Sequence, residues 1–450
     1  MTLVICLVVA VVAYAPVLPT FFLADDFGFV DRLVDLPWRD LGAELHRFGG
    51  AAFWRPLTIL SFYLDGRLWG LNPWGYHLTS VVGHGLAGYG LARWLRPRLA
   101  LAPGGAIAVA SLWLVWPCHG EAVTWIAARS DVLVTLSLVA ALFWLETDRP
   151  RLAGLAFALR LLAKESAWLF PVAVVGWRGW RASLPFWGIW ALYWPLRYLA
   201  LGQWIGGYGT GVDGPAALAN LAIALIRPVF PWGVPLAVGG TGLAVLALRA
   251  PRWVASALLF LLPVAPLGLA GQEGERFLHL PSVFLAGAIA QTLGPSPGRF
   301  WLLVGLYGSL LWANHGRWLT ASAIAHQLIQ DVATLPPPLT VLTVPDTIDG
   351  VYVFRNSFRR AIARFAPQHG RLQEQALQTQ LPDRFGGAAV WPVADGWQWV
   401  GTTPSQAVLR APTIPIWAVQ SDRFRFAGDR TLYYHQGRLV PVPKRCCNPP

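Results

Sequence analysis

Long apolar runs separated by short arginine-rich stretches constrain the fold of this chain more than any other feature. Two of these runs, LVICLVVAVVAYAPVLP and AIAVASLWLVWP, hold no charged residue. A helix needs about 20 apolar residues to cross the hydrocarbon of a bilayer. Charged residues make up 13% of the chain, about half of the fraction usual in soluble domains. The sequence therefore predicts an α-helical integral membrane protein.

The apolar runs predict about eleven membrane-spanning helices. The fifth and sixth of them are short, and a helix break near Lys164 between them would open a cavity inside the bundle, where irregular backbone is tolerated. The expected spans lie near residues 3–23, 76–95, 100–117, 123–145, 151–163, 166–178, 183–201, 217–248, 253–270, 278–294 and 298–315.

Arginine clusters between the runs indicate the orientation of the bundle, since cytoplasmic loops carry an excess of Lys and Arg. We expect a retained first helix with a cytoplasmic N-terminus, because no basic segment precedes it and no small-residue cleavage site follows it. Every cluster then falls on the cytoplasmic side of an inner (plasma) membrane. We attribute the net charge of +12 to this topology and to anionic lipid, not to nucleic acid. The clusters are Arg93, Arg96 and Arg98; Arg149 and Arg151; Arg178 and Arg181; Arg249 and Arg252; and Arg299.

The pattern changes near residue 317, where a small soluble domain is expected. LTVLTVPDTIDGVYVFRNSFRRAIARF is typical of a strand, a turn and an amphipathic helix. AAVWPVADGWQWVG, IPIWAVQ and RTLYYHQGRLVPVP are typical of strands bounded by Gly, Asp and Pro. We therefore expect a membrane domain over 1–316, with a first outer loop at 24–75, and a non-cytoplasmic α+β domain over 317–450.

Two adjacent carboxylates, Asp25 and Asp26, follow the first run in a chain with only 23 acidic residues. One of them at the membrane surface can take a proton from a hydroxyl. Its neighbour can hold it in place, raise its pKa by like-charge repulsion, or ligate a divalent cation such as Mg²⁺ or Mn²⁺. The alternative is a helix cap, because Asp suits the first turn of a helix beginning near Phe27.

The stretch WPCHGEAVTWIAARSDVLVTL places four more ionisable side chains on the same outer face. His119 and Glu121 are two residues apart, which is not the spacing of a helical zinc site, although in a loop both can face one cavity. Arg129 and Asp131 lie in an otherwise apolar run, where ionisable residues are functional candidates. The alternative is that they form an ion pair with each other, or that each neutralises a neighbouring helix.

Further cations suited to binding phosphate follow on this face. Lys164, beside Glu165, can act as a point charge, and the alternative is a snorkelling lysine at a helix end. Arg276, in the stretch EGERFLHLPSV that also holds Glu275 and His279, offers a planar fork for two oxygens. Arg55, in WRPL, is a third candidate.

The order of these motifs carries a family resemblance. DDF, WRPLTILSFYLDGRLWGLNPWGYHLTSVVGH, WPCHGEAVTWIAARSDVLVTL, AKES and GERFLHLPS follow one another within residues 10–320. In this order they resemble the membrane core of the GT-C glycosyltransferases. Among these the chain is most similar to the O-mannosyltransferase-like branch, whose eukaryotic members carry transmembrane and TPR-repeat halves. No repeat of that kind is visible in the C-terminal part.

The resemblance implies an inverting membrane glycosyltransferase that uses a polyprenyl-phosphate-linked sugar on the periplasmic face. It implies that Asp25 or Asp26 is the base, and that Arg129, Lys164 and Arg276, with Arg55, hold the donor phosphate. The acceptor is a protein, a lipid or a glycan. Apart from the resemblance, a lipid or solute transporter would also explain a helical bundle with buried charges, and it would show inverted repeats and polar groups at the midplane. The remaining polar side chains are assigned to sugar or acceptor binding: His77, His119, Glu121, Asp131, Glu165, Glu275 and His279.

Overall fold

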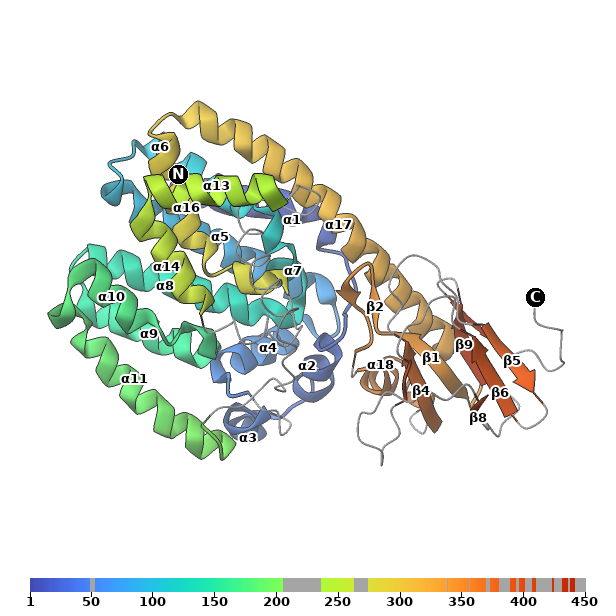
Figure 1. Ribbon diagram of the computed structural model, residues 1–450. Coiled ribbons are helices and arrows are strands. Elements are labelled where there is room, and N and C mark those ends of the chain that lie inside the picture. Colours follow the sequence, from blue (N-terminus) through green and yellow to red (C-terminus); the bar gives the residue numbers. More distant parts are fainter. Residues whose placement is uncertain are drawn as a thin grey trace. The chain divides into compact units, whose positions relative to one another are not determined.

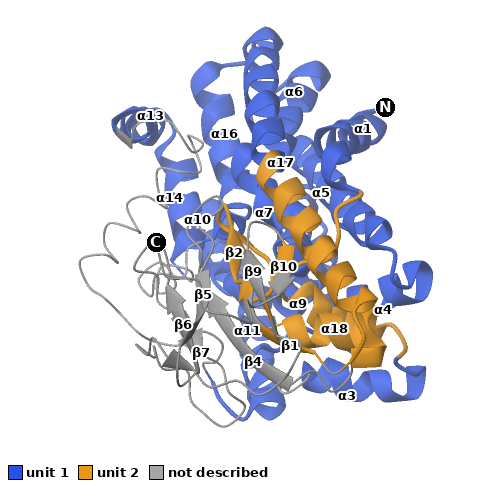
Figure 2. Ribbon diagram, turned by 90° about the vertical axis from the view of Figure 1, so that its right-hand side faces the viewer, with its two compact units in different colours: residues 1–18, 36–315 blue, residues 19–35, 316–450 orange. Residues whose placement is uncertain are grey.

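A computed structural model shows two compact units, coloured separately in Figure 2. Unit 1 comprises residues 1–18 and 36–315, and unit 2 comprises residues 19–35 and 316–450. The structure describes residues 1–48, 53–204, 236–262, 274–337, 339–355, 357–369, 373–379, 389–393, 396–400, 407–409, 423–424, 431–435 and 438–441.

Unit 1 is built from helices, most of them long (Figure 1). Each expected span contains one of these helices, which confirms the helical prediction for the described residues; parts of the spans at 217–248 and 253–270 lie outside them. The helices are α1 (Thr2–Tyr14), α3 (Leu41–His46), α4 (Pro56–Trp69), α5 (Pro73–Arg98), α6 (Pro103–Leu114), α7 (Gly120–Thr124), α8 (Arg129–Glu146), α9 (Pro150–Ala163), α10 (Phe170–Arg178), α11 (Trp180–Leu201), α13 (Leu236–Arg249), α14 (Pro251–Leu261), α16 (Ser282–Leu293) and α17 (Pro297–Thr334), whose second half belongs to unit 2.

Short 3-10 turns connect several of these helices. The expected break near Lys164 is confirmed: α9 ends at Ala163, Lys164 has an extended backbone, and α10 begins at Phe170. Six helices of unit 1, among them α4, α5 and α9, begin with a proline, which is suited to the first helical position because its missing N–H has no partner there anyway. The 3-10 turns of unit 1 are η1 (Ala15–Val17), η2 (Trp38–Asp40), η4 (Pro117–His119), η5 (Ile126–Ala128), η6 (Glu165–Ala167) and η7 (Glu275–Leu278).

Glycines on α5 let three neighbouring helices approach it closely. A Cβ added at Gly85 would lie 3.0 Å from a Leu7 methyl group of α1. At Gly88 and Gly90 it would lie 2.7 and 2.8 Å from side chains of α6 and α8. Small residues permit such close packing in membrane helix bundles. The helix that carries His84 is therefore packed in the centre of unit 1.

The apolar character of the bundle differs from helix to helix. Among the described residues, the stretch Ile126–Glu146 is long and apolar enough to cross a membrane, and the pair Pro103–Leu114 and Pro117–Thr124, bent by 55°, would be a second if it forms one span. Large apolar side chains are exposed along α1 (Val4, Val8 and Val12 at 61%, 54% and 56%). Extended exposed apolar surface of this kind marks contact with lipid or protein. The number of spans, about eleven, stays a prediction.

Unit 2 contains a mixed five-stranded sheet in the order β10-β9-β1-β4-β7. Strand β1 (Thr340–Pro345) pairs in parallel with β4 (Gln373–Thr379) and with β9 (Thr431–His435). The expected strand, turn and helix near 339–365 are confirmed by β1, by the hairpin of β2 (Thr347–Ile348) and β3 (Val351–Tyr352), and by α18 (Phe358–Phe365). The remaining elements are η8 (Pro367–His369), β5 (Ala389–Val393), β6 (Gly396–Val400), β7 (Ala407–Leu409), β8 (Arg423–Phe424) and β10 (Arg438–Pro441); the expected strand IPIWAVQ lies outside the described residues.

Helix α2 (Asp26–Leu33), which follows the first apolar run, packs within unit 2 against α18. Phe27 of α2 stacks on Phe354 with ring centroids 5.9 Å apart, and it meets Phe365 of α18 edge-on at 6.1 Å. Arg364 of α18 donates to Asp35 at 2.5 Å. The segment that carries the acidic pair is therefore held by contacts with the C-terminal part of the chain.

Candidate functional site

Four ion pairs of unit 1 contain the predicted cations, and most of their residues lie at or beside the end of a helix. The antiparallel neighbours α8 and α9 bring Asp131, at the start of one, beside Lys164, just after the other. The positive charges of Arg276 and Arg55 also act on the carboxylate of Asp131. Lys164, Arg276 and Arg55 therefore all act on Asp131. Each of the four predicted cations has a carboxylate partner: Arg55 with Glu165, Arg129 with Asp65, Lys164 with Asp131, and Arg276 with Glu121.

Two of the pairs are buried. Lys164 Nζ lies 2.6 Å from each carboxylate oxygen of Asp131, and both side chains are at most 4% exposed. Arg129 lies 2.5 Å from Asp65 and also donates to the carbonyl of Tyr76 at 2.7 Å. Arg129 and Asp131 thus do not pair with each other. Each neutralises a charged side chain of a different segment. Such pairs are costly to break, because one partner alone leaves an uncompensated buried charge.

The other two pairs are partly open to solvent. Arg55 and Glu165 are 17% and 23% exposed, and two guanidinium nitrogens of Arg55 donate to the two oxygens of Glu165. Burial by itself would raise the pKa of Glu165, but the charge and hydrogen bonds of Arg55, together with the charge of Lys164 and a backbone hydrogen bond, outweigh it and lower the pKa to about 2. Arg276 and Glu121 are each 11% exposed, and the Arg276 backbone N–H also donates to Glu121 at 3.0 Å. These two arginines are the more accessible phosphate candidates.

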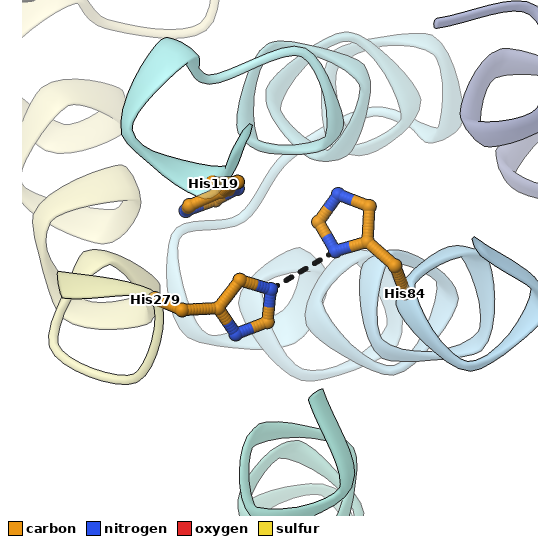
Figure 3. A group of neighbouring side chains, drawn as sticks. All are labelled: His84, His119 and His279. Atoms are coloured by element: carbon orange, nitrogen blue, oxygen red, sulfur yellow. Dashed lines mark hydrogen bonds between the residues drawn. The ribbon is translucent and has the colours of Figure 1, made fainter. Parts of the chain in front are cut away.

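Three buried histidines form a second group in unit 1 (Figure 3). His84 of α5 lies 3.1 Å from His279, measured from Nδ1 to Nε2. His119 of η4 lies 2.8 Å from the Ser282 hydroxyl through its Nε2. One ring nitrogen from each histidine lies within 4.8 Å of the other two. His119 and Glu121 therefore have different partners, and Glu121 is not part of this group.

The acidic pair has two different environments within unit 2. Asp26 is 1% exposed, and its Oδ2 accepts from the backbone N–H of Leu23 at 2.9 Å. Asp25 is exposed, and although it occupies the N-cap position of α2, its side chain makes no capping hydrogen bond. Asp26 lies in the first turn of α2. The positions expected from the helix-cap alternative are therefore found, although Asp25 makes no capping hydrogen bond. Asp25 directly follows Ala24, whose φ of 46° is in the left-handed region.

Two further predicted residues lie in unit 1. His77 is buried on α5, and Glu275 is buried at the start of η7, beside Arg276. The expected roles of all these side chains in binding sugar or acceptor stay predictions. Sequence reasoning assigned no role to Asp65 or His84, although both lie within the quoted motif from Trp54 to His84. Each of them is an ionisable side chain inside an apolar run, and this feature alone marks a functional candidate.

A cavity of about 910 Å³ lies at the other end of α8. Glu146, the last residue of that helix, forms ion pairs there with Arg98 and Arg178. None of the predicted site residues lines this cavity; Arg98, Arg178 and Arg252 do, from three of the predicted cytoplasmic clusters. These clusters therefore meet at one end of the bundle, and the four ion pairs of the candidate site lie elsewhere.

Comparison with known proteins shows relatives among the protein O-mannosyl-transferases. The chain is 30% identical to Tmtc2 of Drosophila melanogaster over 190 residues, which are 37% of this chain and 20% of the relative. It is 37% identical to Tmtc1 of the same fly over 94 residues (20% and 10%) and 35% identical to human TMTC2 over 119 residues (25% and 14%). The matched stretches are related to the O-mannosyl-transferases. This confirms the resemblance predicted from the motifs.

The extent of the match is limited. The matched stretches span a fifth or less of these curated relatives. No family model matches the chain. The cryo-EM structure of the arabinofuranosyltransferase AftD from mycobacteria aligns with a TM-score of 0.42 and 16% identity, over 76% of this chain and 29% of AftD.

Proposed function

We propose that this protein is a membrane glycosyltransferase that moves a sugar from a polyprenyl-phosphate donor to an acceptor hydroxyl, with inversion at the anomeric carbon. The observation that carries the proposal is the set of four ion pairs in an apolar helical bundle, in a chain that is similar to protein O-mannosyl-transferases over part of its length. Such a donor needs its isoprenoid tail in lipid and its phosphate beside cations.

Membrane insertion is supported by surface chemistry. Besides α1, helix α11 exposes Leu192 and Leu199 at 64% and 71%, and α17 exposes Leu302 at 77%. Lipid is the solvent in which such surfaces are stable. We place the chain in an inner membrane. Its arginine clusters then lie on the cytoplasmic side, and the four ion pairs lie on the periplasmic side.

The two partly exposed arginines are proposed to hold the donor phosphate. A guanidinium can bind two phosphate oxygens side by side, and a hydrogen bond to a charged group contributes about 1.5–3 kcal/mol. The charge on the phosphate grows as the bond to the sugar breaks. Arg276 and Arg55 would therefore bind the transition state more tightly than the donor, and so contribute to rate. The buried Lys164 and Arg129 hold the surrounding helices in register.

We assign the base to Asp25. A base must reach the hydroxyl proton of the acceptor, and Asp25 is exposed, whereas Asp26 is buried and accepts the N–H of Leu23. Asp25 takes the proton as the acceptor oxygen attacks the anomeric carbon and the polyprenyl phosphate leaves. If the reaction requires Mg²⁺ or Mn²⁺, carboxylates of this pair would ligate it.

The test is transfer by the purified full chain in detergent, with a panel of short polyprenyl-phosphate sugars and hydroxyl acceptors. We expect release of polyprenyl phosphate and a product of inverted anomeric configuration by NMR. Asp25→Asn should reduce transfer by about 10²- to 10⁴-fold, and Asp40→Asn, at an exposed acid farther along the predicted first outer loop, should not reduce it. Translocation of lipid-linked sugar across proteoliposomes without cleavage would overturn the proposal in favour of a transporter.

A further inference from the structure

We propose that His84, His119 and His279 together bind a divalent transition metal ion of the zinc class. All three side chains are fully buried, and one nitrogen of each lies within 4.8 Å of the others. Imidazole nitrogens bind zinc at about 2.0–2.1 Å, so the ligands of a tetrahedral site lie about 3.3 Å apart. The 3.1 Å between His84 and His279 is close to that separation, and Figure 3 shows the third ring beside them.

The hydrogen bonds of His84 and His279 indicate that the two ring nitrogens that face each other are both unprotonated. Nε2 of His84 faces the carbonyl of Leu114 at 3.0 Å, so it carries the proton and Nδ1 presents a lone pair. The Thr135 hydroxyl lies 2.8 Å from the Asp131 carbonyl, which only accepts, and 2.8 Å from Nδ1 of His279. If this hydroxyl donates to the carbonyl, His279 must donate from Nδ1, and its Nε2 then presents a second lone pair toward His84. A metal cation between the two nitrogens satisfies both.

His119 offers a third lone pair. The Ser282 hydroxyl donates to the carbonyl of His279 at 2.6 Å and accepts from Trp113 at 2.8 Å. Its contact with Nε2 of His119 at 2.8 Å therefore requires that His119 donates. Nδ1 of His119 is then unprotonated, and it has no hydrogen-bond partner among the described residues. Three neutral imidazoles, each held by a hydrogen bond from its other nitrogen, are the donor set of a metal site.

The ion would tie together segments that are far apart in the sequence. His84 belongs to α5, His119 to η4, and His279 directly follows η7. Glu121 lies two residues after His119, and Arg276 lies three residues before His279. The metal would therefore be a positioning element for the Arg276–Glu121 pair, and it would bind whether or not the proposed sugar transfer is correct.

Metal content of the purified chain tests the site directly. The full-length protein, prepared in detergent without a polyhistidine tag, should carry about one zinc per chain by plasma mass spectrometry, or take up one equivalent of Zn²⁺. His119→Gln and His279→Gln should lower the metal content at least about tenfold. His315→Gln is the matched control, since His315 is buried but lies outside the group, and it should retain the metal.

Two further measurements keep the test decisive if a histidine variant does not fold. Wild-type protein loaded with Co²⁺ should show the visible absorption of a tetrahedral site without a sulfur band, although Cys118 lies next to His119 in the sequence. Ser282→Ala keeps all three proposed ligands but removes the hydroxyl that contacts His119, Trp113 and the His279 carbonyl. It should weaken zinc affinity about 10- to 100-fold against a chelator dye. A wild-type chain that takes up neither Zn²⁺ nor Co²⁺ would overturn the site. Undiminished uptake by both histidine variants would equally overturn the site.

Discussion

Asp131 and Lys164 are 33 positions apart in the sequence, yet Nζ of Lys164 lies 2.6 Å from both carboxylate oxygens of Asp131. Both side chains are nearly inaccessible to solvent. The pair joins the start of α8 to the break after α9, and the charges of Arg276 and Arg55 also act on Asp131. It shows that a cation predicted to bind phosphate has a structural partner of its own.

Breaking this pair should destabilise the fold. We expect Lys164→Gln to lower the free energy of unfolding by about 3–5 kcal/mol, because Asp131 would stay charged and buried. The double variant Lys164→Met with Asp131→Leu should recover most of that loss. Thermal unfolding in detergent measures both. If the double variant is stable and still uses the lipid donor normally, Lys164 has no role in binding phosphate.

The two adjacent aspartates should differ in their effects. Asp25→Asn should reduce transfer by about 10²- to 10⁴-fold, the usual contribution of a general base, and leave stability unchanged. Asp26→Ala removes the acceptor of the Leu23 N–H and should lower stability by about 1.5–3 kcal/mol. Transfer kinetics and unfolding curves of both variants separate the roles. Full activity of Asp25→Asn would rule out our assignment of the base.

Arg276 should contribute to the use of the lipid-linked sugar donor. We expect Arg276→Gln to lower kcat/KM for the lipid-linked sugar about 10- to 100-fold, which corresponds to the loss of one charged hydrogen bond. Arg299→Gln, at an exposed position of α17, serves as the control. Donor titrations in detergent distinguish a change in KM from a change in kcat. Equal donor dependence of both variants would contradict the phosphate role.

Acid should weaken the Arg55–Glu165 pair in a defined range of pH. The pKa of Glu165 is lowered from its ordinary value of 4.5 to about 2 in the folded chain. The pair therefore stabilises the fold fully above about pH 4.5, and this contribution is lost as the pH falls toward 2. Arg55→Gln should remove this part of the acid dependence, whereas Arg67→Gln on the same helix should not. Unfolding measured against pH in detergent compares the three proteins.

Ala24 should tolerate glycine but not a branched residue. Its φ of 46° is a left-handed conformation, which is a genuine outlier for β-branched side chains. Ala24→Val should cost about 1–2 kcal/mol of stability, whereas Ala24→Gly should stay within about 1 kcal/mol of wild type. Thermal unfolding tests this. Equal stability of the two variants would mean that the backbone before Asp25 is not strained.

The helices, their proline starts and the break near Lys164 were predictable because they follow from local rules: apolar runs, the fixed φ of proline, and charges that interrupt a run. The strands near 340–352 and 431–441 were predictable from alternation for the same reason. The partners of the charges were not. Arg129 and Asp131 are two residues apart and would suit each other by charge, yet each pairs with a different segment.

The sequence by itself determined a helical apolar chain with basic clusters between its runs, a smaller domain containing strands, and a resemblance to the O-mannosyl-transferases. Only the tertiary structure decided that Asp65 neutralises Arg129, that His84 meets two histidines from distant segments, and that the helix after Asp25 packs on α18. The physical reason is that helix formation and strand alternation depend on near neighbours, whereas charge pairing depends on which helix ends packing brings together. A buried charge must find its partner there, however far apart the two lie in the sequence.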